Sequence, residues 1–260
     1  MPTIDYIFDL MAQGRYTFTV NEIADVLQIS LTAARAALRR LRKKGIIATP
    51  YRGFWVVVPA EYRNFSCLPP DQFIPQLMEH LGEPYYVGLL SAAEYYGAAH
   101  QRPQIFQIVL NKHRSSLECG RIRVGFIARK SLASLPTIPR KTQRGFIQVS
   151  TPEVTAFDLV GYPEHAAGLD NVATILIQLA EHLGRDEIVA AAKLSPMAWA
   201  QRLGYLLNLV GESGKAEKLA EHIRQKDPVP TPLFRAKPFK GAAKDPLWQI
   251  MINGEVEVEV

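Results

Sequence analysis

The segment SLTAARAALRRLRKKG, residues 30–45, combines a small polar residue, several alanines and a dense cluster of cations. Ser30 is suited to cap a helix, because its hydroxyl can accept a hydrogen bond from a free backbone N–H of the first turn. At helical spacing, one apolar stripe follows, made of Ala34, Ala37, Leu38 and Leu41. The segment therefore predicts an amphipathic helix with a narrow buried face and a basic exposed face.

The charge around this helix has one sign. No acidic residue occurs between Asp25 and Glu61, although opposite charges one turn apart would stabilise an ordinary exposed helix. A slender helix with Thr32 and Arg39 on its free face suits the major groove of DNA, whereas the cations near its end suit phosphates. A merely soluble basic face stays the alternative. The residues expected at a DNA interface on this helix are Ser30, Thr32, Arg35, Ala36, Arg39, Arg40, Arg42, Lys43 and Lys44.

Two shorter helices are predicted before it. Residues 3–14 place Ile4, Ile7 and Phe8 on one face, and a glycine ends the pattern. Thr19 and Glu22 have the T-x-x-E spacing of a capping box and open a second helix. Because only a few residues separate this second helix from the helix after Ser30, the pair is typical of a helix-turn-helix.

Two extended runs follow Gly45, IIATP and FWVVVP, and they meet at Tyr51, Arg52 and Gly53. This pattern predicts a β-hairpin with a basic tip, which would complete a winged helix-turn-helix. Tyr51 and Arg52 therefore join the expected DNA-binding residues. Trp55 is expected to cover the small core, because buried area is the main contribution of aromatic side chains.

The rest of the chain predicts an α+β, multidomain protein. Residues 1–60 form the winged helix-turn-helix, and the proline-bearing residues 61–70 form a linker that few contacts cross. Residues 71–227 form a second domain, mixed α/β to about residue 150 and helical beyond it. Residues 228–260, rich in proline and cations, are expected to form an extended C-terminal arm.

The strand-like part of that second domain holds another basic group. RIRVGF, residues 121–126, alternates Ile122, Val124 and Phe126 with Arg121 and Arg123, as a half-buried strand would. Such a group is either a second surface for polyanions or a solvated sheet face. Its members are Lys112, His113, Arg114, Arg121, Arg123, Arg129 and Lys130.

Composition excludes several classes of protein. The chain has 260 residues, 48% hydrophobic and 21% charged, with a formal net charge of +5. No apolar run is long enough to span a bilayer, and the first ten residues carry acids where a signal peptide carries lysines, so the expected location is the cytoplasm. Cys67 and Cys119 lack the spacing of a zinc site, and the six histidines form no ligand pair. We expect no metal and no cofactor.

No catalytic motif is recognisable. GESGKAEK, residues 211–218, resembles a phosphate loop only superficially, because its spacing is wrong and a helical pattern precedes it. Gly211 and Gly214 are interpreted instead as ends of helices. No catalytic residue is therefore predicted.

Three segments resemble the AbiEi family of antitoxins and transcriptional regulators from type IV toxin-antitoxin and abortive infection systems. They are YYVGLLSAAEYYGAAHQRPQIFQIVLNKHRSSLECGRIRVGFIARK at 85–130, VSTPEVTAFDLVGYPEHAAGLDNV at 149–172 and QRLGYLLNLVG at 201–211. The resemblance implies a winged helix that binds inverted repeats in its own promoter, and a C-terminal domain that counteracts a nucleotidyltransferase-like toxin. It implies no enzymatic activity, and only the basic winged-helix residues carry over as a site.

Two other functions stay open. The chain could be a nucleic-acid-processing enzyme that uses the winged helix for targeting, or the winged helix could mediate protein contacts. The expected partners are double-stranded promoter DNA and a cognate toxin, with no membrane. One winged helix covers a half-site, so two copies are expected on an inverted repeat, and they can be monomers in solution.

Overall fold

The computed structural model describes residues 1–99 and 103–258. Backbone contacts divide the chain into two units. Unit 1 holds residues 1–86, 104–130 and 139–148, and unit 2 holds residues 87–103, 131–138 and 149–260. His100 and the last two residues of the expected arm lie outside the described residues. The domain boundaries expected at residues 60, 70 and 227 stay predictions.

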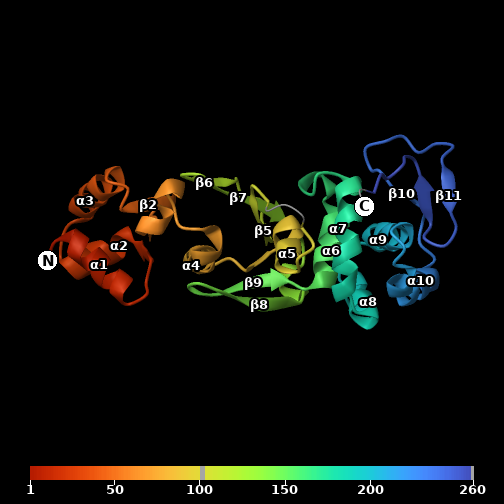
Figure 1. The fold of residues 1–260 in the computed structure, drawn as a ribbon, viewed down its shortest axis with the longest axis horizontal. Helices are drawn as coiled ribbons and strands as arrows, with labels where there is room; N and C mark the ends of the chain where they lie inside the picture. The colour runs from red at the N-terminus through yellow and green to blue at the C-terminus, as the bar shows by residue number, and fades with distance from the viewer. Residues whose placement is uncertain (100–102, 259–260) are drawn as a thin grey trace. The chain divides into compact units, whose positions relative to one another are not determined.

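The first part of unit 1 is a winged helix-turn-helix (Figure 1). Its helices are α1 (Thr3–Ala12), α2 (Val20–Leu27) and α3 (Leu31–Lys43), and its strands are β1 (Thr17–Thr19), β2 (Ile47–Tyr51) and β3 (Phe54–Val57). The three strands form an antiparallel sheet in the order β1-β3-β2. The predicted helices and the predicted hairpin are confirmed, but Phe8, expected on the apolar face of the first helix, is exposed.

The predicted caps are present at two of these helices. Thr19 accepts a hydrogen bond from the Glu22 backbone N–H at 3.1 Å, and Ser30 accepts one from Ala33 at 3.2 Å. Glu22 itself differs from the capping-box expectation, because its carboxylate accepts from the Tyr6 hydroxyl at 2.8 Å and pairs with Arg15 at 2.8 Å. Burial first, and then the Glu22 carboxylate, raise the pKa of Tyr6. The side chain of Glu22 therefore ties α2 to α1.

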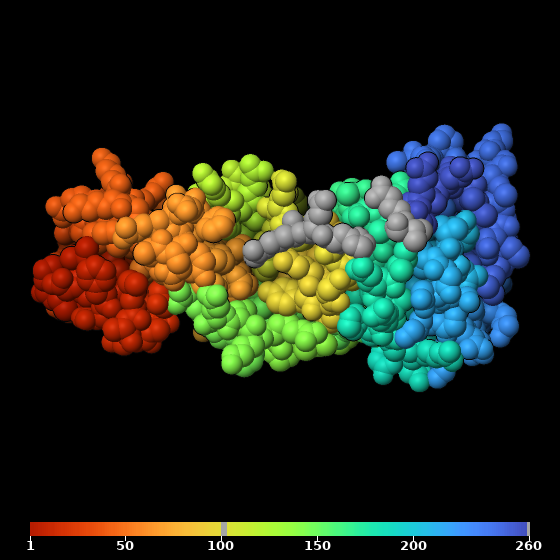
Figure 2. All heavy atoms as spheres, viewed as in Figure 1, coloured from red at the N-terminus to blue at the C-terminus, as the bar shows by residue number. Residues whose placement is uncertain are grey.

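A closed apolar core holds the three helices against the sheet. Figure 2 shows the surface that this part of the chain presents, at the red end of the colour range. Burying a large apolar side chain contributes roughly 1.5–3 kcal/mol, so this core supplies much of the stability of the winged helix. Its most buried members are Ile7, Leu10, Phe18, Ile23, Ala34, Leu38, Ile47 and Val57.

The segment expected to be a linker is locally ordered. It contains the 3-10 helices η1 (Ala60–Phe65) and η2 (Pro70–Gln72), and α4 (Ile74–Leu81) follows directly. Cys67, Leu68 and Phe73 are fully buried. Side chains from this segment and from the winged helix contact residues beyond 110, as described below, so the expectation of few contacts across it is wrong.

A six-stranded mixed sheet follows, in the order β6-β7-β5-β4-β9-β8. β5 and β7 are parallel, with Phe106 opposite Val124, and β6 is antiparallel to β7. On β7 the expected alternation is incomplete, because Val124 is buried but Ile122 and Phe126 are only half-buried. The strands are β4 (Tyr85–Val87), β5 (Phe106–Leu110), β6 (Leu117–Cys119), β7 (Ile122–Ala128), β8 (Thr137–Thr142) and β9 (Gly145–Ser150).

Unit 2 is mainly helical, as predicted. α6 is buried from Glu153 to Gly161 and packs against α5, α7, α8 and α9. Thr151 caps α6 by accepting from the Val154 backbone N–H at 3.4 Å. The helices are α5 (Leu89–Tyr95), α6 (Pro152–Gly161), α7 (Leu169–Leu179), α8 (Arg185–Lys193), α9 (Met197–Leu209) and α10 (Ser213–Lys226). The short 3-10 helix η4 (Pro163–His165) connects α6 to α7, and η5 (Ala180–His182) connects α7 to α8, whereas η3 (Leu132–Ser134) lies between β7 and β8.

The C-terminal segment contains a small sheet of its own. Strand β12 (Ile250–Ile252) lies between β10 (Thr231–Pro232) and β11 (Ala243–Asp245). Arg202 of α9 donates to the carbonyl oxygen of Pro232 at 2.9 Å, and Gln201 donates to that of Gln249 at 3.1 Å. Trp248 is buried against Gly204. Two polar side chains and one tryptophan thus fasten this segment to α9.

Candidate nucleic-acid interface

Helix α3 presents one buried and one exposed face. Ala34 and Leu38 are fully buried, and Leu41 is nearly so. Every residue expected on the free face is exposed, and so is Ser30 at the cap. A helix held by a narrow apolar stripe leaves its opposite side open to a groove of DNA. The exposed residues of the expected set on α3 and its ends are Ser30, Thr32, Arg35, Ala36, Arg39, Arg40, Arg42, Lys43 and Lys44.

The cations of α3 cluster at its C-terminal end. Arg40, Arg42 and Lys43 lie in the last turn, where positive charge also stabilises the helix dipole. None of the nine residues named above makes a side-chain hydrogen bond or ion pair within the described chain, apart from the cap made by Ser30. Their charges are therefore available to an anionic partner.

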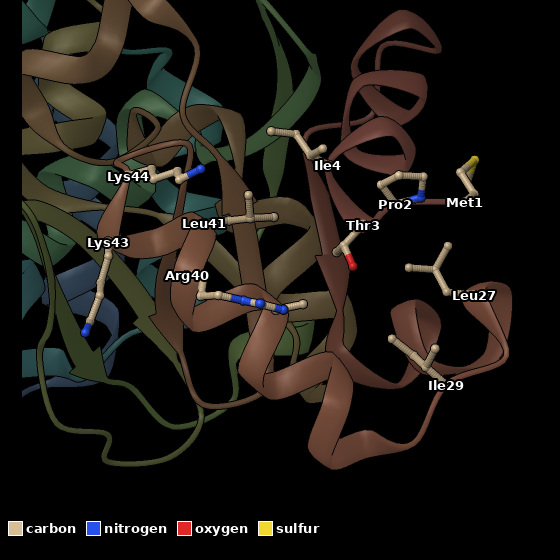
Figure 3. A pocket seen from close by; sticks show the side chains of 11 residues that line it. Met1, Pro2, Thr3, Ile4, Leu27, Ile29, Arg40, Leu41, Lys43 and Lys44 are labelled. Carbon is tan, nitrogen blue, oxygen red and sulfur yellow. The ribbon is translucent and has the colours of Figure 1, made fainter.

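A hollow of about 680 Å³ lies between the start of α1, the end of α2 and the side of α3 (Figure 3). Met1, Ile4 and Leu27 contribute apolar surface to it. Arg40, Lys43 and Lys44 also line it, which places them on the side of α3 next to the hollow. These three exposed cations are thus off the centre of the free face, whereas Arg39 does not line the hollow.

The wing has a rigid base and an exposed tip. Thr49 donates its hydroxyl to the carbonyl oxygens of Tyr51 at 2.9 Å and Phe54 at 3.2 Å, which closes the hairpin. Gly53 has φ +82°, a conformation that glycine adopts without strain, and Arg52 beside it is exposed. Phe54 and Trp55 are buried. The expectation that Trp55 covers the core is confirmed.

Tyr51 is held in a way that its local sequence did not indicate. Its hydroxyl accepts a hydrogen bond from Arg114 at 3.3 Å, and the Arg114 guanidinium lies 5.5 Å from the centre of its ring. Arg114 also pairs with Glu83 at 2.7 Å, and this hydrogen bond raises the pKa of Arg114. Tyr51 is half-buried. Part of its side chain therefore packs against Arg114, and the rest stays open to solvent next to the tip of the wing.

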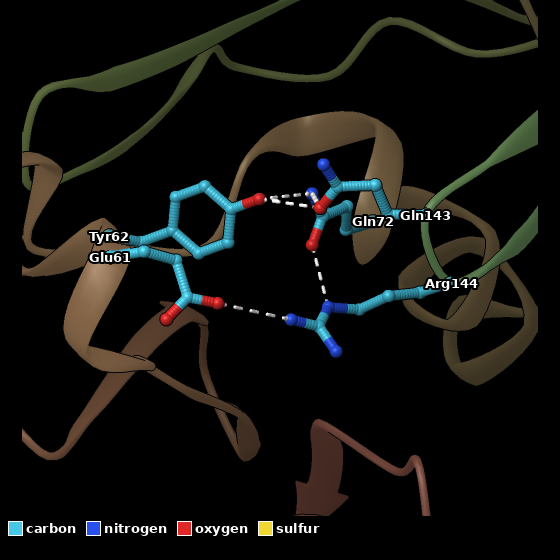
Figure 4. Close-up of polar contacts among 5 residues, drawn as sticks. All are labelled: Glu61, Tyr62, Gln72, Gln143 and Arg144. Carbon is cyan, nitrogen blue, oxygen red and sulfur yellow. Dashed lines mark hydrogen bonds and ion pairs between the residues drawn. The ribbon is translucent and has the colours of Figure 1, made fainter.

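A polar network joins the segment after the winged helix, with η1 and η2, to the β8–β9 hairpin (Figure 4). Arg144 donates from Nε to Gln72 Oε1 at 2.6 Å and lies 3.9 Å from Glu61 Oε1. Tyr62 donates to Gln143 Oε1 at 2.7 Å, and Gln72 donates to the Tyr62 hydroxyl at 2.9 Å. These partners come from distant parts of the sequence, and no local pattern could have paired them.

The second basic group does not form one continuous surface. Arg129 is buried and donates to the Tyr86 hydroxyl at 3.4 Å, and Arg123 lies 3.8 Å from Glu118. Lys112, His113, Arg121 and Lys130 are exposed. Burial and ion pairing therefore remove several of its members from any polyanion surface.

Two buried cysteines lie beneath the wing. Cys119 on β6 and Cys67 are both buried, and β6 packs against β2. The hydrogen bond with Cys67 lowers the pKa of Cys119; burial raises it, and the charge of Arg42 and the Thr49 N–H lower it. Both cysteines are free thiols.

The described residues give little support to a metal site, a membrane-spanning helix or a phosphate loop. Within residues 1–99 and 103–258, no group of three His, Cys, Asp or Glu side chains could hold a metal ion. Over the same ranges, no helix is both long and apolar enough to cross a bilayer. In GESGKAEK, Gly211 follows α9 with φ +87°, as expected, but Gly214 lies inside α10 and Lys215 donates to the Leu183 carbonyl. Gly214 is the second residue of α10 and therefore marks the start of that helix, not the end of the one before it.

Comparison with known proteins gives a consistent result. Residues 5–58 match the family described as transcriptional regulator, AbiEi antitoxin, and residues 86–209 match the AbiEi antitoxin C-terminal domain. The fold is similar to the crystal structure of the RV2827C protein from Mycobacterium tuberculosis, with a TM-score of 0.68 and 18% sequence identity. That similarity covers 94% of this chain and 89% of the other. No curated protein matches the sequence.

Proposed function

Because the chain belongs to the AbiEi family of antitoxins and transcriptional regulators, we propose that it represses its own promoter by binding inverted repeats in duplex DNA. The observation that carries this proposal is the exposed face of α3, where arginines and lysines without intramolecular partners surround the short side chains of Thr32 and Ala36. Short side chains let the helix backbone approach the base edges, and Arg39 can bond to guanine. The exposed Arg52 of the wing would contact the DNA backbone.

Two copies are needed on one operator. A single winged helix covers one half-site, and half-sites read by two symmetric copies lie near whole turns of DNA apart. The surface described above is built within one chain, so two monomers can meet on the DNA. Pairing in free solution is not required.

The second activity is that of an antitoxin. We infer that residues 86–209 counteract a nucleotidyltransferase-like toxin, and that they do so without catalysis. The match to the antitoxin C-terminal domain supports this assignment. The DNA-binding surface lies outside that range, on residues 30–52, so the two activities should be separable by mutation.

The DNA-binding proposal is tested with the full chain and a promoter fragment that carries the inverted repeat. Footprinting at one fixed salt concentration should protect both arms, and scrambling one arm should weaken binding to the other. Random duplex DNA of equal length is the control, because phosphate contacts alone bind it too. Equal affinity for promoter and random DNA contradicts the proposal.

The antitoxin proposal is tested by co-expression with a nucleotidyltransferase-like toxin of the kind proposed above. The unchanged chain should restore growth and silence a promoter reporter. Arg39→Ala should lose silencing and keep protection, because Arg39 is exposed and lies outside residues 86–209. Loss of both activities in a folded Arg39→Ala protein contradicts the separation.

A further inference from the structure

The loop between β5 and β6, residues 111–116, lies against the wing. Arg114 in this loop donates to the Tyr51 hydroxyl at 3.3 Å, and its guanidinium faces the ring of Tyr51 at 5.5 Å. Tyr51 is the last residue of β2 and directly precedes Arg52 at the wing tip. The loop is therefore held next to the tip of the wing.

A second contact holds the same region. Strand β6, which follows the loop, packs against β2. Glu83 fixes Arg114 from the other side through an ion pair of 2.7 Å, in which both side chains are mostly buried. The contact at Tyr51 and the packing of β6 on β2 thus set the position of the loop along β2.

Some of the cations near this loop are paired with acidic side chains, and others are free to bind an anionic partner. Glu83 neutralises Arg114, and Glu118 lies close to Arg123. Lys112 and His113 are exposed, and within residues 1–99 and 103–258 neither forms a hydrogen bond or an ion pair. Lys112 is thus a cation of this loop that no acidic side chain among the described residues neutralises.

We propose that the β5–β6 loop is a second phosphate-binding element of the DNA interface, in which Lys112 contacts the DNA backbone next to the contact made by Arg52. The inference rests on the proposed function, because it extends the same interface beyond residue 58. Lysine binds phosphate as a point charge and needs only an exposed, positioned stem. Arg114 is a positioning residue, since its own guanidinium is already occupied by Tyr51 and Glu83.

The test is the salt dependence of DNA affinity for the full chain and for Lys112→Ala. Each phosphate contact that is lost reduces the slope of log affinity against log salt by about 0.9. We expect this reduction for Lys112→Ala on promoter and random DNA alike, because a phosphate contact carries no sequence information. Circular dichroism should be unchanged, since Lys112 is exposed.

The matched control is Lys141→Ala. Lys141 is an exposed lysine on β8, at the opposite edge of the six-stranded sheet from β6, so its removal should leave the slope unchanged. An equal reduction for both variants would reflect net charge alone and would overturn the inference. An unchanged slope in Lys112→Ala, with Arg39→Ala still weakening promoter binding, would overturn the inference and leave the proposed function standing. If the unchanged chain binds no duplex DNA, this result overturns both the inference and the proposed function.

Discussion

The guanidinium of Arg144 lies 3.2 Å from the centre of the Tyr16 ring, so the tip of the β8–β9 hairpin stacks on the segment between α1 and β1. The same guanidinium donates to Gln72 at 2.6 Å, and only 15% of the Arg144 side chain is exposed. A cation held over an aromatic face away from water is worth more than an exposed one. This contact therefore ties the winged helix to a hairpin far along the chain.

Arg144→Ala should lower the free energy of unfolding by about 1–2 kcal/mol, because it removes the contact with Tyr16 and leaves Gln72 without its donor. Urea unfolding followed by circular dichroism measures the change. Lys141→Ala, an exposed neighbour on the same hairpin, should stay within about 0.5 kcal/mol of the unchanged protein. Equal stability of all three proteins would show that the stacked pair contributes nothing.

Arg39→Ala and Lys44→Ala should differ in what they remove from DNA binding. Arg39→Ala should weaken binding to promoter DNA by about 1–3 kcal/mol, because a base contact is lost. It should weaken binding to random DNA much less. Lys44→Ala should weaken both alike, since a phosphate contact is not specific. Gel shifts at one salt concentration measure the four affinities, and equal losses on both DNAs for both variants would refute base reading by Arg39.

Gly204→Ala and Gly214→Ala should change stability in opposite directions. A Cβ on Gly204 would overlap the buried ring of Trp248, which must then move, so we expect a loss of about 1–3 kcal/mol. A Cβ on Gly214 meets only Arg185 Nη2, at an ordinary 3.6 Å, and alanine favours the helix by up to about 1 kcal/mol. Thermal unfolding of both variants is the measurement. A tolerated Gly204→Ala would mean that Trp248 does not pack tightly there.

His222 should make the protein less stable in mild acid. Burial, and then the charges of Lys226 and Lys193, lower the pKa of His222 below its usual 6.5. As the pH falls through 6.5, the unfolded chain therefore takes up a proton that the folded chain resists, and the free energy of unfolding decreases. His222→Gln should lose less stability between pH 7.5 and 5.5 than the unchanged protein. The same loss in both proteins would exclude His222 as a cause.

Much of the winged helix could be predicted because its signals are local. The caps at Thr19 and Ser30 join residues three positions apart, and the stripe of α3 repeats every three or four residues. The wing could be predicted from two extended runs that flank Gly53. In the caps and in the stripe, the interacting residues lie close together in the sequence. The exposed face of α3 therefore follows from the spacing of its apolar residues alone.

The sequence alone thus determined the winged helix, its basic free face and the change to helices after residue 150. Only the tertiary structure decided which cations are available: it buried Arg129 beside Tyr86, paired Arg114 with Glu83 and Tyr51, and stacked Arg144 on Tyr16. The physical reason is that the partner of a long charged side chain depends on the path of the whole chain. Residues next to an arginine in sequence do not restrict which distant carboxylate or aromatic ring the fold brings to it.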